Sequence, residues 1–170
     1  MLGIVNERVE GEIFYNKLNI KKLDMYWLRK EKIAIMSQEF NAFFDETVMD
    51  MILEVDPKFC ENNLLEKNTI NELFGSDEIF KELMHKQLKQ LSGGEKQKVG
   101  FVWCLTKNAD VLILDEPTVS VDLKGVEIIK KELKKQAYKK MVIMVSHDIE
   151  LLKICDEVIE LEMNNKNKGE

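Results

Sequence analysis

Residues 91–122 have the sequence LSGGEKQKVGFVWCLTKNADVLILDEPTVSVD. Here Ser92, a residue type that often caps a helix, precedes Gly93 and Gly94, which have no Cβ to hold a ligand away. The apolar residues that follow recur at helical spacing, at Val99, Val102, Trp103 and Leu105. A helix start has N–H groups without helical partners and the positive end of the helix dipole, which both attract anions such as phosphate. The stretch predicts an inward-packed helix that begins at Ser92, with either an anion site or a plain cap at its start.

An apolar strand and two acids follow this helix. Residues 111–114 read VLIL without polar alternation, which is typical of a central parallel strand covered on both faces. The run ends in Asp115 and Glu116, and Pro117 stops the strand. Ligands of open α/β sheets lie at the carboxyl ends of strands, and neighbouring strand residues point to opposite sides. The two acids are therefore expected to have different roles, in which one holds Mg²⁺ through water and the other orients or deprotonates an attacking water.

Other elements are predicted on both sides of the central stretch. The expected strands are residues 12–16, 32–36, 141–145 and 158–161. The expected helices are residues 23–30, an amphipathic helix at 123–137, and a helix at 149–154 capped by Asp148. Between them, residues 47–90 are helical in character, with breaks at Pro57, Asn62, Asn63, Gly75 and Ser76. The strand at 141–145 is expected to be buried and to end in Ser146 and His147.

Length and composition limit the class of protein. A chain of 170 residues with 45% apolar content suits one globular domain with a real core. The net charge of −6 argues against general affinity for nucleic acid or for anionic lipid, so no nucleic-acid partner is expected. The three cysteines are far apart in the sequence and indicate neither a disulfide framework nor a zinc site. No apolar run has the length of a membrane span, so a cytoplasmic location is expected.

Taken together and in this order, these motifs resemble the ATP-binding cassette (ABC) family of ATPases. Residues 91–95 are similar to its signature motif, 111–116 to its Walker B strand and 120–122 to its D-loop. Gln38, directly after the strand at 32–36, resembles the Q-loop glutamine, and His147 resembles the switch histidine. The resemblance covers nearly the whole chain.

The resemblance implies a fold, cofactors and partners. The fold is α/β: a P-loop NTPase-like, mostly parallel sheet with flanking helices at 1–40 and 93–161, and a helical subdomain at 41–92. The first strands and the phosphate loop of the family are expected to be absent, and the composition of residues 162–170, with three Asn and two Lys, predicts a flexible tail. ATP and Mg²⁺ are the implied cofactors. A second ABC ATPase domain, arranged head to tail, and a transporter membrane subunit that holds the chain at the inner face of the cell membrane are the implied partners.

The resemblance also implies roles for individual residues. It assigns catalysis to Glu116, His147 and Gln38, and it assigns Mg²⁺ to Asp115 and Gln38. The residues that it assigns to nucleotide binding are Ser92, Gly93, Gly94, Glu95 and Asp122.

One motif of the family is missing from the sequence. A phosphate loop requires G-x-x-x-x-G-K-[ST], and none of the 8 glycines here is followed by lysine. The resemblance therefore implies that the chain begins after the phosphate loop, at the end of the helix that follows it. Three functions stay open: the ATPase of a membrane transporter, a non-catalytic subunit that lends its signature motif to a complete partner, and a soluble ABC protein. Leu28 and Arg29 before a strand, with Gln38 and the pair Phe43 and Phe44 after it, favour an exporter-like transporter.

Overall fold

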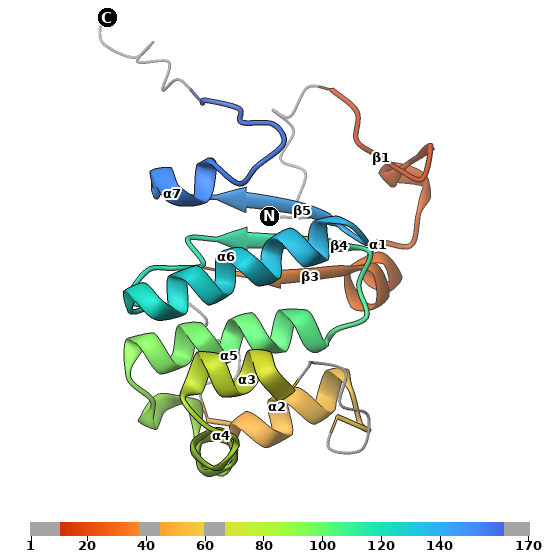
Figure 1. Cartoon of the computed structure of the whole chain (residues 1–170). Helices are drawn as coiled ribbons and strands as arrows, with labels where there is room; N and C mark the ends of the chain where they lie inside the picture. Colours follow the sequence, from red (N-terminus) through yellow and green to blue (C-terminus); the bar gives the residue numbers. More distant parts are fainter. Residues whose placement is uncertain (1–10, 38–44, 60–66, 162–170) are drawn as a thin grey trace, which may run out of the picture.

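The computed structural model describes residues 11–37, 45–59 and 67–161. Its centre is a parallel sheet of three strands in the order β3, β4, β5, with bounds Ile33–Met36, Val111–Asp115 and Met141–Val145. The helices α5 (Gly93–Thr106) and α6 (Leu123–Ala137) pack along the sheet, and the helices between residues 48 and 84 lie on the side of α5 away from the sheet (Figure 1). The central position predicted for the strand at 111–114 is confirmed.

Within the described residues, one face of this sheet is fully covered and the other is largely open. Alternate residues of the strands, among them Ala34, Leu112 and Leu114, are fully buried in one apolar cluster with residues of α5 and α6. The other face carries Met141 and Ile143, whose side chains are 63% and 42% exposed. The expectation that the strand at 111–114 is covered on both faces holds fully for only one face, because Val111 and Ile113, which point to the other face, are only partly buried.

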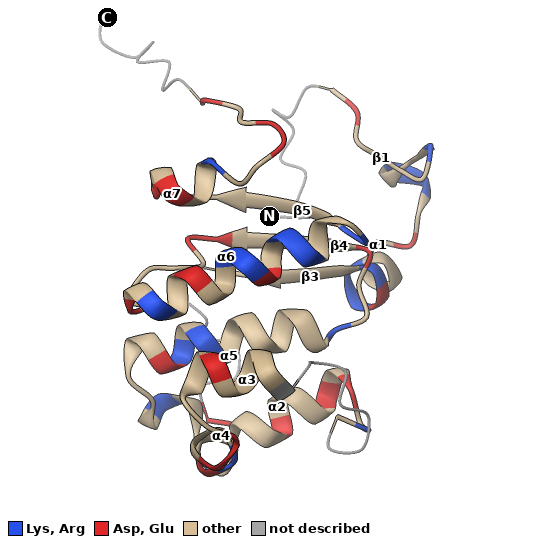
Figure 2. Cartoon of the chain, in the orientation of Figure 1, with Lys and Arg blue, Asp and Glu red and all other residues tan. Residues whose placement is uncertain are grey.

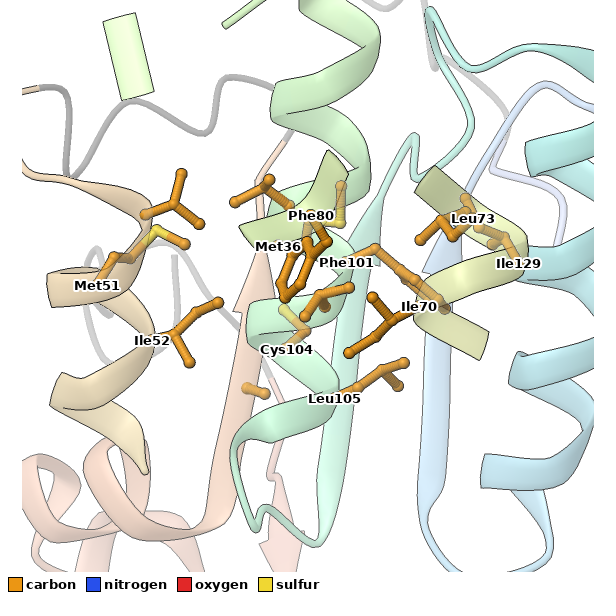
Figure 3. Packing of buried hydrophobic residues seen from close by; sticks show 14 of the residues in the cluster. Met36, Met51, Ile52, Ile70, Leu73, Phe80, Phe101, Cys104, Leu105 and Ile129 are labelled. Carbon is orange, nitrogen blue, oxygen red and sulfur yellow. The ribbon is translucent and has the colours of Figure 1, made fainter. Parts of the chain in front are cut away.

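The small helices form a layer beyond α5. They are α2 (Val48–Val55), α3 (Lys67–Phe74), α4 (Asp77–Met84) and the short turn η3 (Leu88–Gln90), all inside the stretch predicted to be helical. Thr47 and Ser76 cap α2 and α4 through their side chains. Figure 3 shows Met51, Phe80 and Phe101 from three helices in one packed group, and the same cluster continues to Leu112 in the sheet. One core therefore joins the helical layer to the sheet.

The helices expected around the central stretch are present. Helix α5 begins after Ser92, and α6 has the predicted bounds. Helix α7 (Ile149–Leu152) is capped by Asp148 as predicted, although it ends sooner than expected. Figure 2 shows acidic and basic residues interspersed along α6, which suits a solvated face. In the region of the short helix predicted at 23–30, α1 (Met25–Trp27) continues directly into the turn η2 (Leu28–Lys32).

The outermost segments depart from the predicted strands. Residues 12–16 contribute only β1 (Phe14–Tyr15), which pairs with β2 (Leu18–Asn19) in a hairpin, before the short turn η1 (Ile20–Lys22). Residues 158–161 are exposed and irregular, so the final strand predicted there is wrong. A strand requires a paired neighbour, and β5 has no strand on its outer side among residues 11–37, 45–59 and 67–161. None of the described helices is both long and apolar enough to cross a bilayer.

Candidate nucleotide-binding and catalytic site

The start of α5 is an exposed, self-capped helix terminus. The Oγ of Ser92 accepts a hydrogen bond from the N–H of Glu95 at 3.3 Å, and the N–H of Ser92 donates to the Glu95 carboxylate at 2.8 Å. The Ser92 hydroxyl donates to the same carboxylate oxygen at 2.7 Å. These bonds hold the pKa of Glu95 below its ordinary value. Ser92 and Gly93 face solvent, so an anion could approach this helix start from outside.

The second glycine of this helix start lies against the loop that joins β4 to α6. A Cβ at Gly94 would lie 2.6 Å from the carbonyl oxygen of Ser120, whereas one at Gly93 would lie 3.6 Å from the Ser120 side chain. Ser120 has a left-handed backbone with φ of 66°. The loop from Glu116 to Asp122 is thus packed directly against the first turn of α5.

Glu116 occupies the carboxyl end of β4 in a fixed position. Its backbone is left-handed, with φ of 48°, and its N–H donates to the carbonyl of Val145 at 2.8 Å. Its carboxylate accepts from the Ser146 hydroxyl at 3.2 Å and from the N–H of His147 at 2.9 Å. The Glu116 side chain is 12% exposed, whereas the His147 ring, 3.9 Å away, is fully exposed. The sequence-predicted residues Glu116 and His147 therefore lie together at the same edge of the sheet.

Asp115 and Asp122 have different surroundings. Asp115 ends β4, is half-buried, and stands opposite Val145 in the register of the sheet. Asp122 caps α6 by accepting from the N–H of Gly125 at 2.8 Å, and it pairs with Lys98 at 2.6 Å. The Lys98 ammonium, followed by the Gly125 hydrogen bond, lowers the pKa of Asp122. The only role that these contacts give Asp122 is to fix the end of the loop.

The described residues contain no group of three or more His, Cys, Asp or Glu side chains that could hold a metal ion by themselves. Mg²⁺ in nucleotide sites usually needs only one or two carboxylates, because phosphate oxygens and water complete its shell. Asp115 therefore suits a metal that arrives with a nucleotide. Gln38, Phe43 and Phe44 lie outside the described residues, so the structure does not place them.

Three side chains of this region had no site role predicted from the sequence: Gln97, Lys98 and Ser146. Gln97 is only 6% exposed, and its Nε2 donates to the backbone carbonyl of Glu116 at 2.7 Å. The spacing of Gln97 in the sequence could have indicated that its side chain points inward. Gln97 precedes the buried Phe101 and Cys104 by four and seven residues, which places all three on one helix face. A polar residue at such an inward position needs a buried partner.

Much of the sequence that forms this site matches the model of a known protein family. The model of the family described as ABC transporter matches residues 1–119. The chain belongs to the ABC transporter family.

Two of the curated relatives are named as ATP-binding proteins of transporters. This ABC chain is 33% identical over 160 residues to the energy-coupling factor transporter ATP-binding protein EcfA2 of Caldanaerobacter subterraneus subsp. tengcongensis, with 88% of the chain and 54% of the relative covered. It is 30% identical to the methionine import ATP-binding protein MetN 1 of Oenococcus oeni, with 95% of the chain and 47% of the relative covered. The chain spans about half the length of these two relatives.

Solved structures show the same fold. The dimeric structure of MJ0796, described as a bacterial ABC transporter cassette, matches with a TM-score of 0.70 and 26% identity, over 85% of this chain and 66% of that one. A post-hydrolysis state of MJ0796 bound to ADP and Pi matches with a TM-score of 0.67. An Atm1-family exporter, at 24% identity and a TM-score of 0.68, supports the fold alone.

Proposed function

We propose that this chain works as part of an ATP-hydrolysing ABC subunit that powers a membrane transporter. The observation that carries the proposal is the position of the Glu116 carboxylate and its hydrogen bonds. Its carboxylate is held against Ser146 and His147 at the carboxyl end of the central strand, where α/β proteins place their ligands. Transporter subunits among the relatives and a dimeric cassette among the structures support it.

Each site residue has a proposed role. Bound ATP with Mg²⁺ supplies a phosphoanhydride bond that water can cleave to ADP and phosphate. Asp115 would hold Mg²⁺, with Gln38 as its proposed companion from the sequence, because carboxylate and amide oxygens suit this cation. Glu116 would orient the attacking water and accept its proton, and the exposed His147 ring would donate a hydrogen bond toward phosphate.

The other nucleotide-binding residues would serve a partner. Ser92, Gly93, Gly94 and Glu95 form an exposed helix start on this chain, and we assign them to a nucleotide held by a second ABC ATPase domain placed head to tail. Asp122 would fix the loop beside them. The dimeric state of MJ0796 supports such a partner. A membrane subunit would hold the complex at the inner face of the cell membrane, and exporter-like transport is the direction proposed from the sequence.

The sequence also supports a second function, in which the chain does not hydrolyse ATP and only lends its signature motif. This alternative depends on one observation, which is that the sequence has no G-x-x-x-x-G-K-[ST]. The two functions make opposite predictions for Glu116. A hydrolysing subunit needs the Glu116 carboxylate, and a lending subunit does not.

The test is ATP hydrolysis by the purified chain, alone and mixed with an ABC ATPase chain of the same organism that contains G-x-x-x-x-G-K-[ST]. Hydrolysis that is lost on both Glu116→Gln and Ser92→Arg supports the hydrolysing subunit. Hydrolysis of the mixture that is lost on Ser92→Arg but kept on Glu116→Gln supports the lending subunit. Ser76→Arg is the matched control, because it removes a capping serine from α4, away from the site. Absence of hydrolysis by the chain alone, together with absence of stimulated hydrolysis in every mixture, would overturn both.

A further inference from the structure

A buried amide joins the first turns of α5 to the candidate catalytic carboxylate. Gln97 follows the Ser92 cap by little more than one turn, and its Nε2 donates to the backbone carbonyl of Glu116 at 2.7 Å. The two residues are 19 positions apart in the sequence, and the Gln97 side chain is 6% exposed. Water therefore competes poorly for this hydrogen bond.

Glu116 needs external support for its conformation. A left-handed backbone is unfavourable for a residue with a Cβ and persists only where the surroundings hold it. Two groups of contacts provide this support. From the β5 side, Val145, Ser146 and His147 bond to the Glu116 N–H and carboxylate. From the α5 side, Gln97 bonds to the carbonyl.

Other contacts tie the same part of α5 to the same loop. Gly94 approaches the carbonyl of Ser120, and Lys98 pairs with Asp122 at 2.6 Å. The loop from Glu116 to Asp122 is thus fixed to α5 near both of its ends and in between. A displacement of the helix start is therefore expected to move the loop as well.

We propose that Gln97 is a positioning residue for Glu116, and that it transmits displacements of the α5 start to the Glu116 carboxylate. The inference rests on the proposed function, in which the α5 start faces the nucleotide of a partner and Glu116 serves the chain's own site. Through Gln97, contact with the partner's nucleotide would adjust the carboxylate of this chain. The two sites would then respond to each other through α5 and the Gln97 hydrogen bond, in addition to the direct contacts between α5 and the loop.

The first test uses Gln97→Met in the full chain, without nucleotide. Methionine keeps the length and the approximate volume of glutamine but cannot donate. The reporter is the amide of His147, which is bonded to the Glu116 carboxylate. We expect native-state hydrogen exchange at His147 to accelerate roughly tenfold relative to the amide of Leu112, the factor that one lost hydrogen bond of ordinary strength gives. Dividing the exchange rate of the His147 amide by that of the Leu112 amide removes the effect of any loss of stability that is uniform across the protein.

The matched control lies on the same helix. Thr106 is buried near the end of α5, and its hydroxyl donates to the carbonyl of Val102 at 2.9 Å. Thr106→Val also removes one buried hydrogen bond, but far from Glu116, so the normalised exchange of His147 should stay unchanged. If Gln97→Met does not fold, Gln97→Asn, which is too short to reach Glu116, is measured instead. Unfolding of both variants would overturn the proposal, because Gln97 would then be a general structural residue.

The second test addresses transmission. Gly94→Ala forces a movement between the α5 start and Ser120, so it should shift the amide resonances of Glu116 and His147. In the Gln97→Met background these shifts should fall to less than about half, because only the loop route remains. Equal shifts in both backgrounds, or normalised exchange at His147 that Gln97→Met leaves unchanged, would overturn the proposal. Neither measurement involves ATP, so the outcome is separate from that of the hydrolysis test.

Discussion

The backbone of Gly94 lies against the carbonyl oxygen of Ser120, and a Cβ at position 94 would come to 2.6 Å from that oxygen. A contact this short with a backbone atom can only be relieved by moving the helix or the loop. Ser120 is already in a left-handed conformation, with φ of 66°, so the loop has little freedom to move. The second glycine of the Ser-Gly-Gly start is therefore required by packing within the chain, in addition to any ligand.

The first prediction compares the two glycines of this start. Gly94→Ala should destabilise the fold by about 1–3 kcal/mol, the usual cost of forcing an extra methyl group into a packed site. Gly93→Ala should change the stability by less than about 0.5 kcal/mol, since its Cβ would meet Ser120 at 3.6 Å, an ordinary contact. Urea denaturation of both variants measures the difference. Equal stability of the two would show that the helix start and the loop do not pack this tightly in solution.

The second prediction concerns acid pH and Glu95. Hydrogen bonds from the side chain and the backbone of Ser92 hold the folded-state pKa of Glu95 below its ordinary value of 4.5. A carboxyl group whose pKa is depressed by folding contributes stability above its unfolded-state pKa and loses that contribution as the pH falls through its folded-state pKa. The stability advantage of wild type over Glu95→Gln should therefore be constant near neutral pH and shrink below about pH 4.5.

Urea denaturation of the two proteins at a series of pH values tests this. Glu127→Gln, on the exposed side of α6, controls for the change in net charge. An advantage over Glu95→Gln that does not decrease on acidification would contradict the capping role of the ionised carboxylate.

The third prediction concerns the open face of the sheet. Ile143 is 42% exposed there, whereas Leu114 is fully buried against the helices. Ile143→Thr should cost less than about 1 kcal/mol, because little apolar surface returns to water. Leu114→Ala should cost about 2–5 kcal/mol, since it leaves a cavity in the packed core. A cost for Ile143→Thr close to that of Leu114→Ala in urea denaturation would show that this face is covered in solution.

The sequence correctly predicts those helices and strands whose boundaries are marked by a capping residue or by a change in polarity. The cap at Ser92, the apolar run after Asp110 and the amphipathic pattern after Asp122 give the starts of α5, β4 and α6 correctly. Each of these boundaries has its own chemistry in the chain, a capping side chain or an abrupt change in polarity. Local chemistry of this kind needs no tertiary contact to be recognised.

The sequence could not predict properties that depend on neighbours. An apolar strand such as residues 141–145 has the same pattern whether or not something covers it, so the pattern alone predicts burial for its exposed face. Residues 158–161 have the composition of a strand, but they have no paired strand among the described residues. In the site, the family resemblance predicts Glu116 and His147 together. The bond from Gln97 to a backbone carbonyl could not be expected, because it depends on how the loop folds back on α5.

The last prediction separates the two contacts of Asp122. Its carboxylate caps α6 through the N–H of Gly125 and pairs with Lys98, whose side chain is largely buried. Asp122→Asn keeps a capping oxygen but loses the ion pair, whereas Asp122→Ala loses both. We expect the stability to fall in the order wild type, Asn, Ala, with the step from Asn to Ala near the usual value of about 1 kcal/mol for a lost cap. Lys98→Met in combination with Asp122→Asn completes a double-mutant cycle for the ion pair. If Asn is as unstable as Ala in urea denaturation, the pair with Lys98, and not the cap, holds the end of this loop.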